Sequence, residues 1–265
     1  MPKTFPFIDL HEDLLLHCTR RDLYPPQHWQ TNLPMLERSD ARVVVATAFP
    51  VPPGENYFDP ASNAMIEEDF RAYAAACALD PRWAIVRSAA DIASAFASGG
   101  PRGLLLHIEG LNVVGSGDWD RLERWYGLGW RSLGIVWNLT NPLGGGTRDS
   151  VQGLTPLGAE MLRWLQERRM IVDFAHMNAP TFADALRIVR GPIIVSHGNA
   201  AACCPNPRNY SDEQLRAIAE RGGVVGVFFA QPVVTGAQPA VIAAVVRPID
   251  HLRTVMGEGP LALGA

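Results

Sequence analysis

Histidine and carboxylate side chains stand directly after four separate apolar runs in this sequence of 265 residues. The residues at these positions are His11, Asp13, His107, Glu109, His176 and His197. Imidazole and carboxylate groups together are typical ligands of zinc and similar divalent ions. Each group taken alone has an ordinary explanation as a capping, rim or hydrogen-bonded loop residue. Their joint occurrence after four runs favours a metal site over coincidence.

The spacing of these groups fits two metal ions. Residues two apart in an extended strand point to the same side, so His11 and Asp13 are predicted to bind one ion together. His176 and His197 follow neighbouring strands and are predicted to share a second ion. Glu109 has two carboxylate oxygens and is predicted to bridge the ions, which lie about 3.5–4 Å apart in such sites and activate a shared water. His107 is predicted to hydrogen-bond a ligand carboxylate.

The apolar runs that precede these groups are predicted to be strands of one buried sheet. They cover residues 6–11, 41–49, 103–109, 132–138, 170–176, 192–198, 223–230 and 260–265, with a further candidate at 83–88. Amphipathic stretches between them predict helices over 61–80, 89–98, 118–127, 156–169, 179–190, 212–221 and 239–256. Thr155 before Pro156 predicts a helix start, and Ser211 with Gln214 predicts a capping box.

Apolar strands that alternate with helices predict an α/β fold with a parallel sheet covered by helices. A closed (β/α)8 barrel and an open doubly wound sheet both satisfy this pattern. In a barrel, the active site is built at the carboxyl ends of the strands. Five of the seven histidines, at positions 11, 17, 107, 176 and 197, lie at or just past such ends. No helix follows the last predicted strand, so a barrel would lack its last helix.

Composition excludes several classes of protein. The chain carries 23 basic and 27 acidic residues and a net charge of −4, which argues against a nucleic-acid partner. No apolar run reaches membrane-spanning length and the first residues lack the apolar core of a signal peptide, so no membrane partner is expected. The four cysteines, at positions 18, 77, 203 and 204, form no CxxC pair. We therefore predict a reducing, cytoplasmic location, with two loop thiols at the adjacent pair.

The order of these motifs resembles that of the renal (membrane) dipeptidase family, which are zinc peptidases on a (β/α)8 TIM barrel within the amidohydrolase-like group. The resemblance runs the full length of the chain. It is carried by the segments "IDLHED", "HIEG", "QGLTPLGAEMLRWLQERRMIVDFAHMN", "GPIIVSHGNA" and "NPRNYSDEQLRAIAERGGVVGV". It implies a single metal-dependent hydrolase barrel domain over residues 1–265, a homodimer, and a small dipeptide as the substrate.

Carried over residue by residue, the resemblance implies two zinc ions per chain. His11 and Asp13 would be ligands of one ion. His176 and His197 would be ligands of the other. Glu109 would bridge both ions and hold the attacking water.

The resemblance also implies how a substrate is held. Arg208 resembles the arginine that grips the substrate's C-terminal carboxylate, a role that suits the fork of a guanidinium group. Family members carry a histidine that stabilises the tetrahedral intermediate in the segment that corresponds to "SLGIVWNLTN", where this chain has Trp137. Trp donates one hydrogen bond and carries no charge, so Asn138 is a further candidate donor to the substrate.

The end of the sequence, like Trp137, departs from the family pattern. Family members continue after the eighth strand with a Gly-x-Asp motif, whose aspartate binds metal and shuttles the proton. This sequence ends at Ala265, just where that aspartate is expected. The resemblance therefore implies a C-terminally incomplete chain, for which we expect poor solubility and negligible activity.

The predicted function is zinc-dependent hydrolysis of small dipeptides by a metal-activated hydroxide. A second hypothesis is another amidohydrolase-type activity, either removal of an acyl group from an amino acid or opening of a small cyclic amide. A third hypothesis, which the truncation and Trp137 both favour, is a catalytically silent metal-binding protein.

Overall fold

A computed structural model of the chain describes residues 5–14, 31–50, 58–112, 114–236, 242–257 and 261–264. The predictions made for His17 and Cys18 lie outside these residues. The chain divides into two compact units, one formed by Met1–Glu109 with Val113–Ser132 and the other by Gly110–Asn112 with Leu133–Ala265. We call them the first and the second unit. The prediction of one domain over residues 1–265 stays a prediction.

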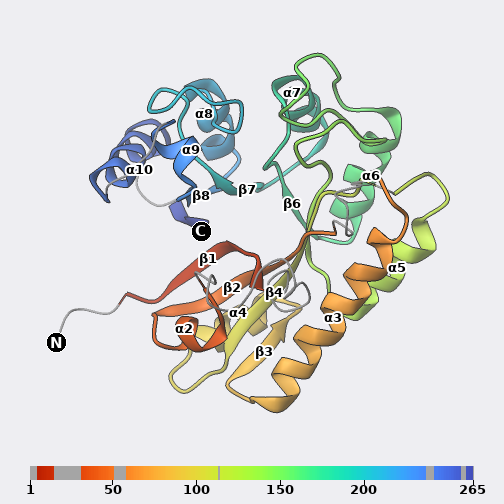
Figure 1. Cartoon of the computed structure of the whole chain (residues 1–265), viewed down its shortest axis with the longest axis vertical. Helices are drawn as coiled ribbons and strands as arrows, with labels where there is room; N and C mark the ends of the chain where they lie inside the picture. The colour runs from red at the N-terminus through yellow and green to blue at the C-terminus, as the bar shows by residue number, and fades with distance from the viewer. Residues whose placement is uncertain are drawn as a thin grey trace. The chain divides into compact units, whose positions relative to one another are not determined.

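The first unit contains a parallel sheet (Figure 1). Its strands are β1 (Phe7–Glu12), β2 (Ala41–Ala48), β3 (Trp83–Val86) and β4 (Arg102–Glu109). β2 lies between β1 and β4, and β3 pairs with β4. The middle strands are buried along almost their whole length, with Val45 opposite Leu105 and Thr47 opposite His107. This burial explains why both strands read as continuous apolar runs.

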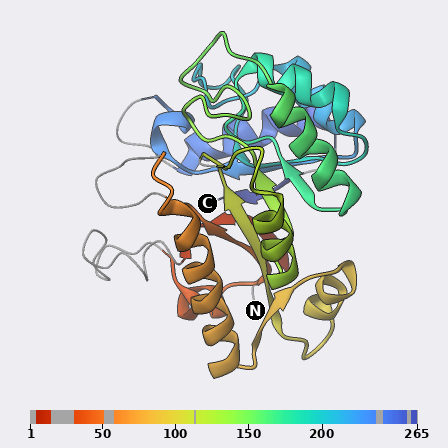
Figure 2. The same cartoon turned by 90° about the vertical axis from the view of Figure 1, so that its right-hand side faces the viewer.

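The helices of the first unit are α2 (Leu33–Glu37), α3 (Ser62–Leu79), α4 (Ala89–Phe96) and α5 (Trp119–Leu128). Helix α4 starts with a capping box in which Ser88 and Asp91 each satisfy the other's backbone N–H. Helices α3 and α5 run alongside each other, orange and yellow-green in Figures 1 and 2, and are linked by the ion pair between Arg124 and Glu67.

The second unit contains parallel strands in the order β5, β6, β7, β8, β9. They are β5 (Ser132–Gly134, whose first residue belongs to the first unit), β6 (Ile171–Asp173), β7 (Ile194–Gly198), β8 (Val224–Phe228) and β9 (Leu261–Gly264). The helices are α6 (Pro156–Glu167), α7 (Ala179–Ile188), α8 (Asp212–Glu220), α9 (Gln231–Val234) and α10 (Ile242–Met256).

Local sequence signals place the helix starts of the second unit. The Thr155 side chain accepts from Gly158 N and Pro156 occupies the first turn of α6, as predicted. Ser211 and Gln214 form the predicted capping box of α8.

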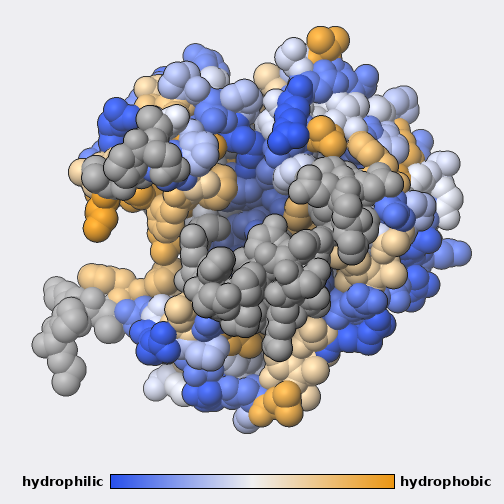
Figure 3. Space-filling model, in the orientation of Figure 1, coloured by the Kyte–Doolittle hydropathy of each residue, from blue (hydrophilic) through white to orange (hydrophobic). Residues whose placement is uncertain are grey.

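Helix α10 exposes Ile242 and Val246, and apolar colour is visible near this helix in Figure 3.

Two strands are shorter than the sequence predicts. β6 ends at Asp173 because the Asp173 side chain accepts a hydrogen bond from Ala175 N, and His176 has a φ of 64°, which no strand residue adopts. β5 ends at Gly134, and beyond it the carbonyl of Ile135 accepts from the Asn141 side chain as well as from Leu111 N. At both strand ends a polar side chain bonds to a nearby backbone group.

The remaining findings concern the elements outside the predicted pattern, membrane-crossing helices and the cysteines. The candidate strand at 83–88 is confirmed as β3, whereas the short helices α2 and α9 were not predicted. Within the described residues, none of the helices combines the length and the apolar character that crossing a membrane requires. Cys77 and the adjacent pair Cys203 and Cys204 are free thiols.

Candidate metal centre

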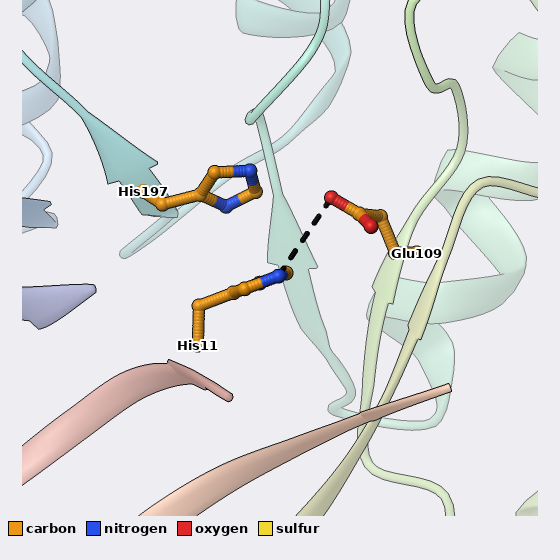
Figure 4. A group of neighbouring side chains, drawn as sticks. All are labelled: His11, Glu109 and His197. Carbon is orange, nitrogen blue, oxygen red and sulfur yellow. Dashed lines mark ion pairs between the residues drawn. The ribbon is translucent and has the colours of Figure 1, made fainter. Parts of the chain in front are cut away.

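Three of the predicted ligands lie together in the first unit. His11 Nε2 lies 3.5 Å from Asp13 Oδ1 and 3.9 Å from Glu109 Oε1, and Figure 4 draws the second of these ion pairs. His11 is 4% exposed and Glu109 is 5% exposed. His197, drawn with them in Figure 4, belongs to the second unit. A buried imidazole that faces two carboxylates is a donor set that suits a divalent cation.

The neighbouring strand fixes the orientation of His11. Thr47 of β2 is fully buried, and its Oγ1 lies 3.4 Å from His11 Nδ1. The backbone N–H of His11 donates to Asp9 Oδ1 at 3.2 Å. With Nδ1 directed toward Thr47, the opposite nitrogen, Nε2, faces the two carboxylates. This is the arrangement of a metal-ligating histidine whose second nitrogen is held by the protein.

His107 lies on β4 next to this group and is fully buried. Its Nδ1 lies 2.8 Å from Ser132 Oγ, and its ring stands edge-on to the His11 ring with 6.1 Å between centroids. The hydrogen bond to a ligand carboxylate that the sequence predicts for His107 stays a prediction.

Burial shifts the titration of two carboxyl groups in the first unit. Burial, and then the negative charge of Asp9, raise the pKa of Glu12 to about 8. Burial, and then the charges of Glu68 and Asp13, raise the pKa of Asp69 to about 7. Each shift means that the folded environment disfavours the ionised form of the carboxyl group.

The other two predicted ligands meet in the second unit. His176 Nε2 lies 2.9 Å from His197 Nε2, and the two rings are 4.9 Å apart between centroids. His197 lies on β7, and His176 follows β6 in the left-handed region with a φ of 64°. Such a conformation is uncommon for a residue with a side chain, although histidine adopts it more readily than most residues.

Hydrogen bonding sets the tautomer of His176. Its Nδ1 lies 2.8 Å from Asn138 Oδ1, and the same oxygen accepts from Thr147 Oγ1. An amide oxygen only accepts, so Nδ1 carries the ring proton and Nε2 presents a lone pair toward His197. His176 is therefore held in the form that binds a metal through Nε2.

The predicted substrate-binding residues also lie near this pair. Arg208 Nη2 donates to the backbone carbonyl of His197 at 3.3 Å, and among the described residues Arg208 Nη1 has no hydrogen-bond partner. Asn138 uses its oxygen to hold His176. Trp137 places its ring 5.9 Å from the His176 ring. The roles of Arg208 and Asn138 in substrate binding stay predictions.

Sequence reasoning missed the polar residues that orient the ligands. Thr47, Ser132, Asp173 and Ser196 are all buried and bonded to or near the candidate histidines. Each lies inside an apolar run, where a single small polar residue reads as part of a strand. A polar residue at a central strand position is itself a signal, because burial requires a hydrogen-bond partner.

Parallel strands that alternate with helices, with imidazole and carboxylate groups at or after their carboxyl ends, define an α/β protein that can bind metal. The fold class is the (β/α)8 TIM barrel. A crystal structure of the metallo-peptidase dipeptidase AC, of family M19, matches with a TM-score of 0.86 and 26% identity over 99% of this chain and 85% of that chain. A metallo-peptidase from Rhodobacter sphaeroides, liganded with a phosphinate mimic of the dipeptide L-Ala-D-Ala, matches with a TM-score of 0.81 and 25% identity over 99% and 86%.

The chain belongs to the membrane dipeptidase family (peptidase family M19), whose model matches residues 1–265. An uncharacterized protein in the pqqA 5′ region of Klebsiella pneumoniae is 36% identical over 173 residues, which cover 61% of this chain and 64% of that protein. An uncharacterized dipeptidase of Schizosaccharomyces pombe is 31% identical over 189 residues, which cover 68% of this chain and 45% of that protein. The chain thus spans less than two thirds of the length of these curated relatives.

Proposed function

We propose that the protein is a zinc-dependent dipeptidase that binds two zinc ions per chain. The observation that carries the proposal is the pair of Nε2 atoms of His176 and His197, 2.9 Å apart, with the first held as a lone-pair donor. Membership of the dipeptidase family supports the choice of reaction. The R. sphaeroides relative, solved with a mimic of L-Ala-D-Ala, supports small dipeptides as the substrate class.

The residues present fit a pair of zinc ions. His11 and Asp13 would hold one ion, and His176 and His197 the other. Glu109 would be the shared ligand that the family resemblance implies. Bound there, zinc would supply a hydroxide nucleophile at neutral pH and polarise the peptide carbonyl.

The remaining steps belong to the side chains of this protein. The guanidinium of Arg208 binds the substrate's C-terminal carboxylate through Nη1, which has no hydrogen-bond partner among the described residues. The amide of Asn138 donates to the substrate while its oxygen keeps His176 in place. The buried Glu109 carboxylate holds the attacking water in position for the peptide carbon. The predicted dimer and the cytoplasmic location stay predictions.

The test combines metal content with substrate choice. Zinc-loaded protein is expected to contain two ions per chain by elemental analysis, and Glu109→Gln is expected to lower this number because one residue serves both ions. The loaded protein is then given L-Ala-D-Ala, L-Ala-L-Ala, N-acetyl-alanine and a small cyclic amide. Cleavage of the dipeptides alone supports the proposal, and cleavage of only the acyl amino acid or the cyclic amide overturns it.

Trp137 favours a second candidate function. Its ring lies 5.9 Å from the His176 ring, in the segment where the resemblance implies a histidine that stabilises the intermediate. A metal-binding protein without turnover would bind two zinc ions and cleave none of these substrates. If the absent histidine alone keeps the protein silent, Trp137→His is expected to give it dipeptidase activity. If other catalytic groups are absent as well, the variant is expected to stay inactive.

A further inference from the structure

A chain of three buried polar side chains ends at His197. Asp173 is the last residue of β6, and Ser196 and His197 are adjacent on β7. The Ser196 hydroxyl donates to Asp173 Oδ2 and lies 2.8 Å from His197 Nδ1. Asp173 is 1% exposed, Ser196 is 0% exposed and His197 is 3% exposed. Sequence analysis gave no role to the first two residues, and the proposed function does not use them.

The Asp173 carboxylate is fixed by two backbone groups as well. Its Oδ1 accepts from Ala175 N and from Ser196 N, both at 2.9 Å. One bond comes from its own strand end and the other from β7, so the carboxylate is locked between two chain segments. The backbone of Ser196 is enclosed in turn, since a Cβ at Gly226 or Gly264 would lie 2.0 Å or 2.2 Å from its carbonyl oxygen. The Ser196 backbone therefore lies close against Gly226 of β8 and Gly264 of β9.

The direction of the protons follows from this geometry. A carboxylate accepts only, so the Ser196 hydroxyl gives its single proton to Asp173. Toward His197 the Ser196 oxygen can then only accept. His197 Nδ1 must carry the ring proton, and His197 Nε2 presents a lone pair. Through the hydroxyl, the carboxylate thus determines which nitrogen of the imidazole carries the proton.

We propose that Asp173 and Ser196 are positioning residues that hold His197 in the tautomer whose Nδ1 carries the ring proton. His176 is held in the same tautomer by Asn138, so two lone pairs face each other across 2.9 Å. Two lone pairs that face each other repel, and a cation bound by both nitrogens would relieve this repulsion, so the hydrogen-bond network favours metal binding. The proposal rests on the proposed function only in naming zinc as that cation.

The variant Asp173→Asn tests the proton direction. The new amide can still accept from Ala175 N and Ser196 N, but its NH₂ group donates to the Ser196 hydroxyl. The hydroxyl then donates to His197 Nδ1, and the ring proton moves to Nε2. Replacing an aspartate by asparagine next to a histidine inverts the tautomer in this way in serine proteases, without a change of geometry. In this protein the variant would place a proton where zinc should bind.

The first measurement is the tautomer of His197 in metal-free protein, by long-range ¹⁵N–¹H NMR with the signal assigned through His197→Gln. Wild-type protein is expected to show a proton on Nδ1, and Asp173→Asn a proton on Nε2. The second measurement is zinc affinity by competition with a chelator, which is expected to fall about 10–100-fold in Asp173→Asn, the usual effect of losing such a partner. Ser196→Ala is expected to weaken zinc binding as well.

Thr181→Val is the matched control, because it removes another buried hydroxyl of the second unit that bonds to Gly145 and to no histidine. It is expected to lower stability without changing the tautomer or the zinc affinity. A proton on His197 Nε2 in wild-type protein overturns the proposal, and so does an Asp173→Asn variant that binds zinc like the wild type. Wild-type protein with the proton on Nδ1 that binds no zinc instead overturns the proposed function and keeps the role of Asp173 and Ser196.

Discussion

Asp69 should make the metal-free protein less stable as the pH rises. It lies on the buried face of α3 with Ile66 and Tyr73, and Tyr73 donates to the carbonyl of Thr47 on β2. Burial, followed by the charges of Glu68 and Asp13, raises its pKa from 3.8 to about 7. A carboxyl group that holds its proton more tightly when folded opposes folding wherever the unfolded chain has lost that proton.

The sign and size of the effect follow from the two pKa values. Below pH 3.8 both states are protonated and Asp69 costs nothing. Between that value and about pH 7 the cost grows by about 1.4 kcal/mol per pH unit. Above pH 7 it is constant at about 4 kcal/mol, which is comparable with the whole stability of many domains. At pH 5 the cost is only about 2 kcal/mol by the same relation.

Asp69→Asn should remove this pH-dependent cost. The free energy of unfolding of metal-free protein is measured in urea with a chelator at pH 5 and at pH 8. The gain of the variant over wild type is expected to be about 3 kcal/mol larger at pH 8 than at pH 5, because the cost of ionising Asp69 grows between pH 5 and pH 7 and the buried amide has no charge at either pH. Comparing the two pH values cancels any constant cost of burying the amide.

Asp91→Asn is the control for this measurement. Hydrogen bonds from Arg87 N and from Ser88 lower the pKa of Asp91, so its contribution to stability is lost only as the pH falls below the ordinary aspartate range. The control should therefore change stability equally at pH 5 and pH 8. If Asp69→Asn also shifts stability equally at the two values, Asp69 is ionised in the folded protein over the whole range and the reasoning is refuted.

Three further predictions concern the site and the packing. Arg208→Ala should raise KM for dipeptides and leave the cleavage of dipeptide amides, which lack the terminal carboxylate, nearly unchanged; equal losses on both would mean that Arg208 is structural. Ser88→Ala removes the cap of α4 and should cost about 1 kcal/mol in urea unfolding, with no change in zinc content. Gly146→Ala would bring a Cβ within 2.0 Å of the carbonyl oxygen of Trp137, so it should lower the thermal midpoint, and an unchanged midpoint would show that this loop can move apart.

The central strands and long helices could be predicted from the sequence because their signals are local. Strands β2 and β4 are buried on both faces and read as apolar runs, and α6 and α8 carry caps that lie within four residues of their start. The carboxyl ends of β5 and β6 could not be predicted in the same way. They depend on side chains such as Asn141 and Asp173, which bond to backbone groups close in sequence, and the pattern of apolar residues does not encode these bonds.

The ligand histidines and carboxylates could also be predicted from the sequence, because their positions relative to the strands are local signals. A spacing of two residues on a strand puts His11 and Asp13 on one side, and the structure brings His11 Nε2 within 3.5 Å of Asp13 Oδ1. The two histidines of the second unit follow adjacent strands, and their Nε2 atoms meet at 2.9 Å. Pattern alone could not say which nitrogen of each ring carries the proton, because that depends on partners in other elements.

The partners of His197 depend on the register of two parallel strands. Asp173 of β6 stands opposite Ile194 of β7, and this register puts its carboxylate within reach of Ser196, two residues further along. A shift of one residue would turn Ser196 to the other face of the sheet and leave Asp173 buried without its hydroxyl donor. An unsatisfied buried carboxylate is costly, so the same hydrogen bonds that set the tautomer of His197 also penalise a register slip. The strand register and the tautomer of His197 therefore depend on the same hydrogen bonds. Asp173→Asn separates the two effects, because the amide oxygen can still accept from Ala175 N and Ser196 N while the amide NH₂ reverses the direction of the hydrogen bond with the Ser196 hydroxyl.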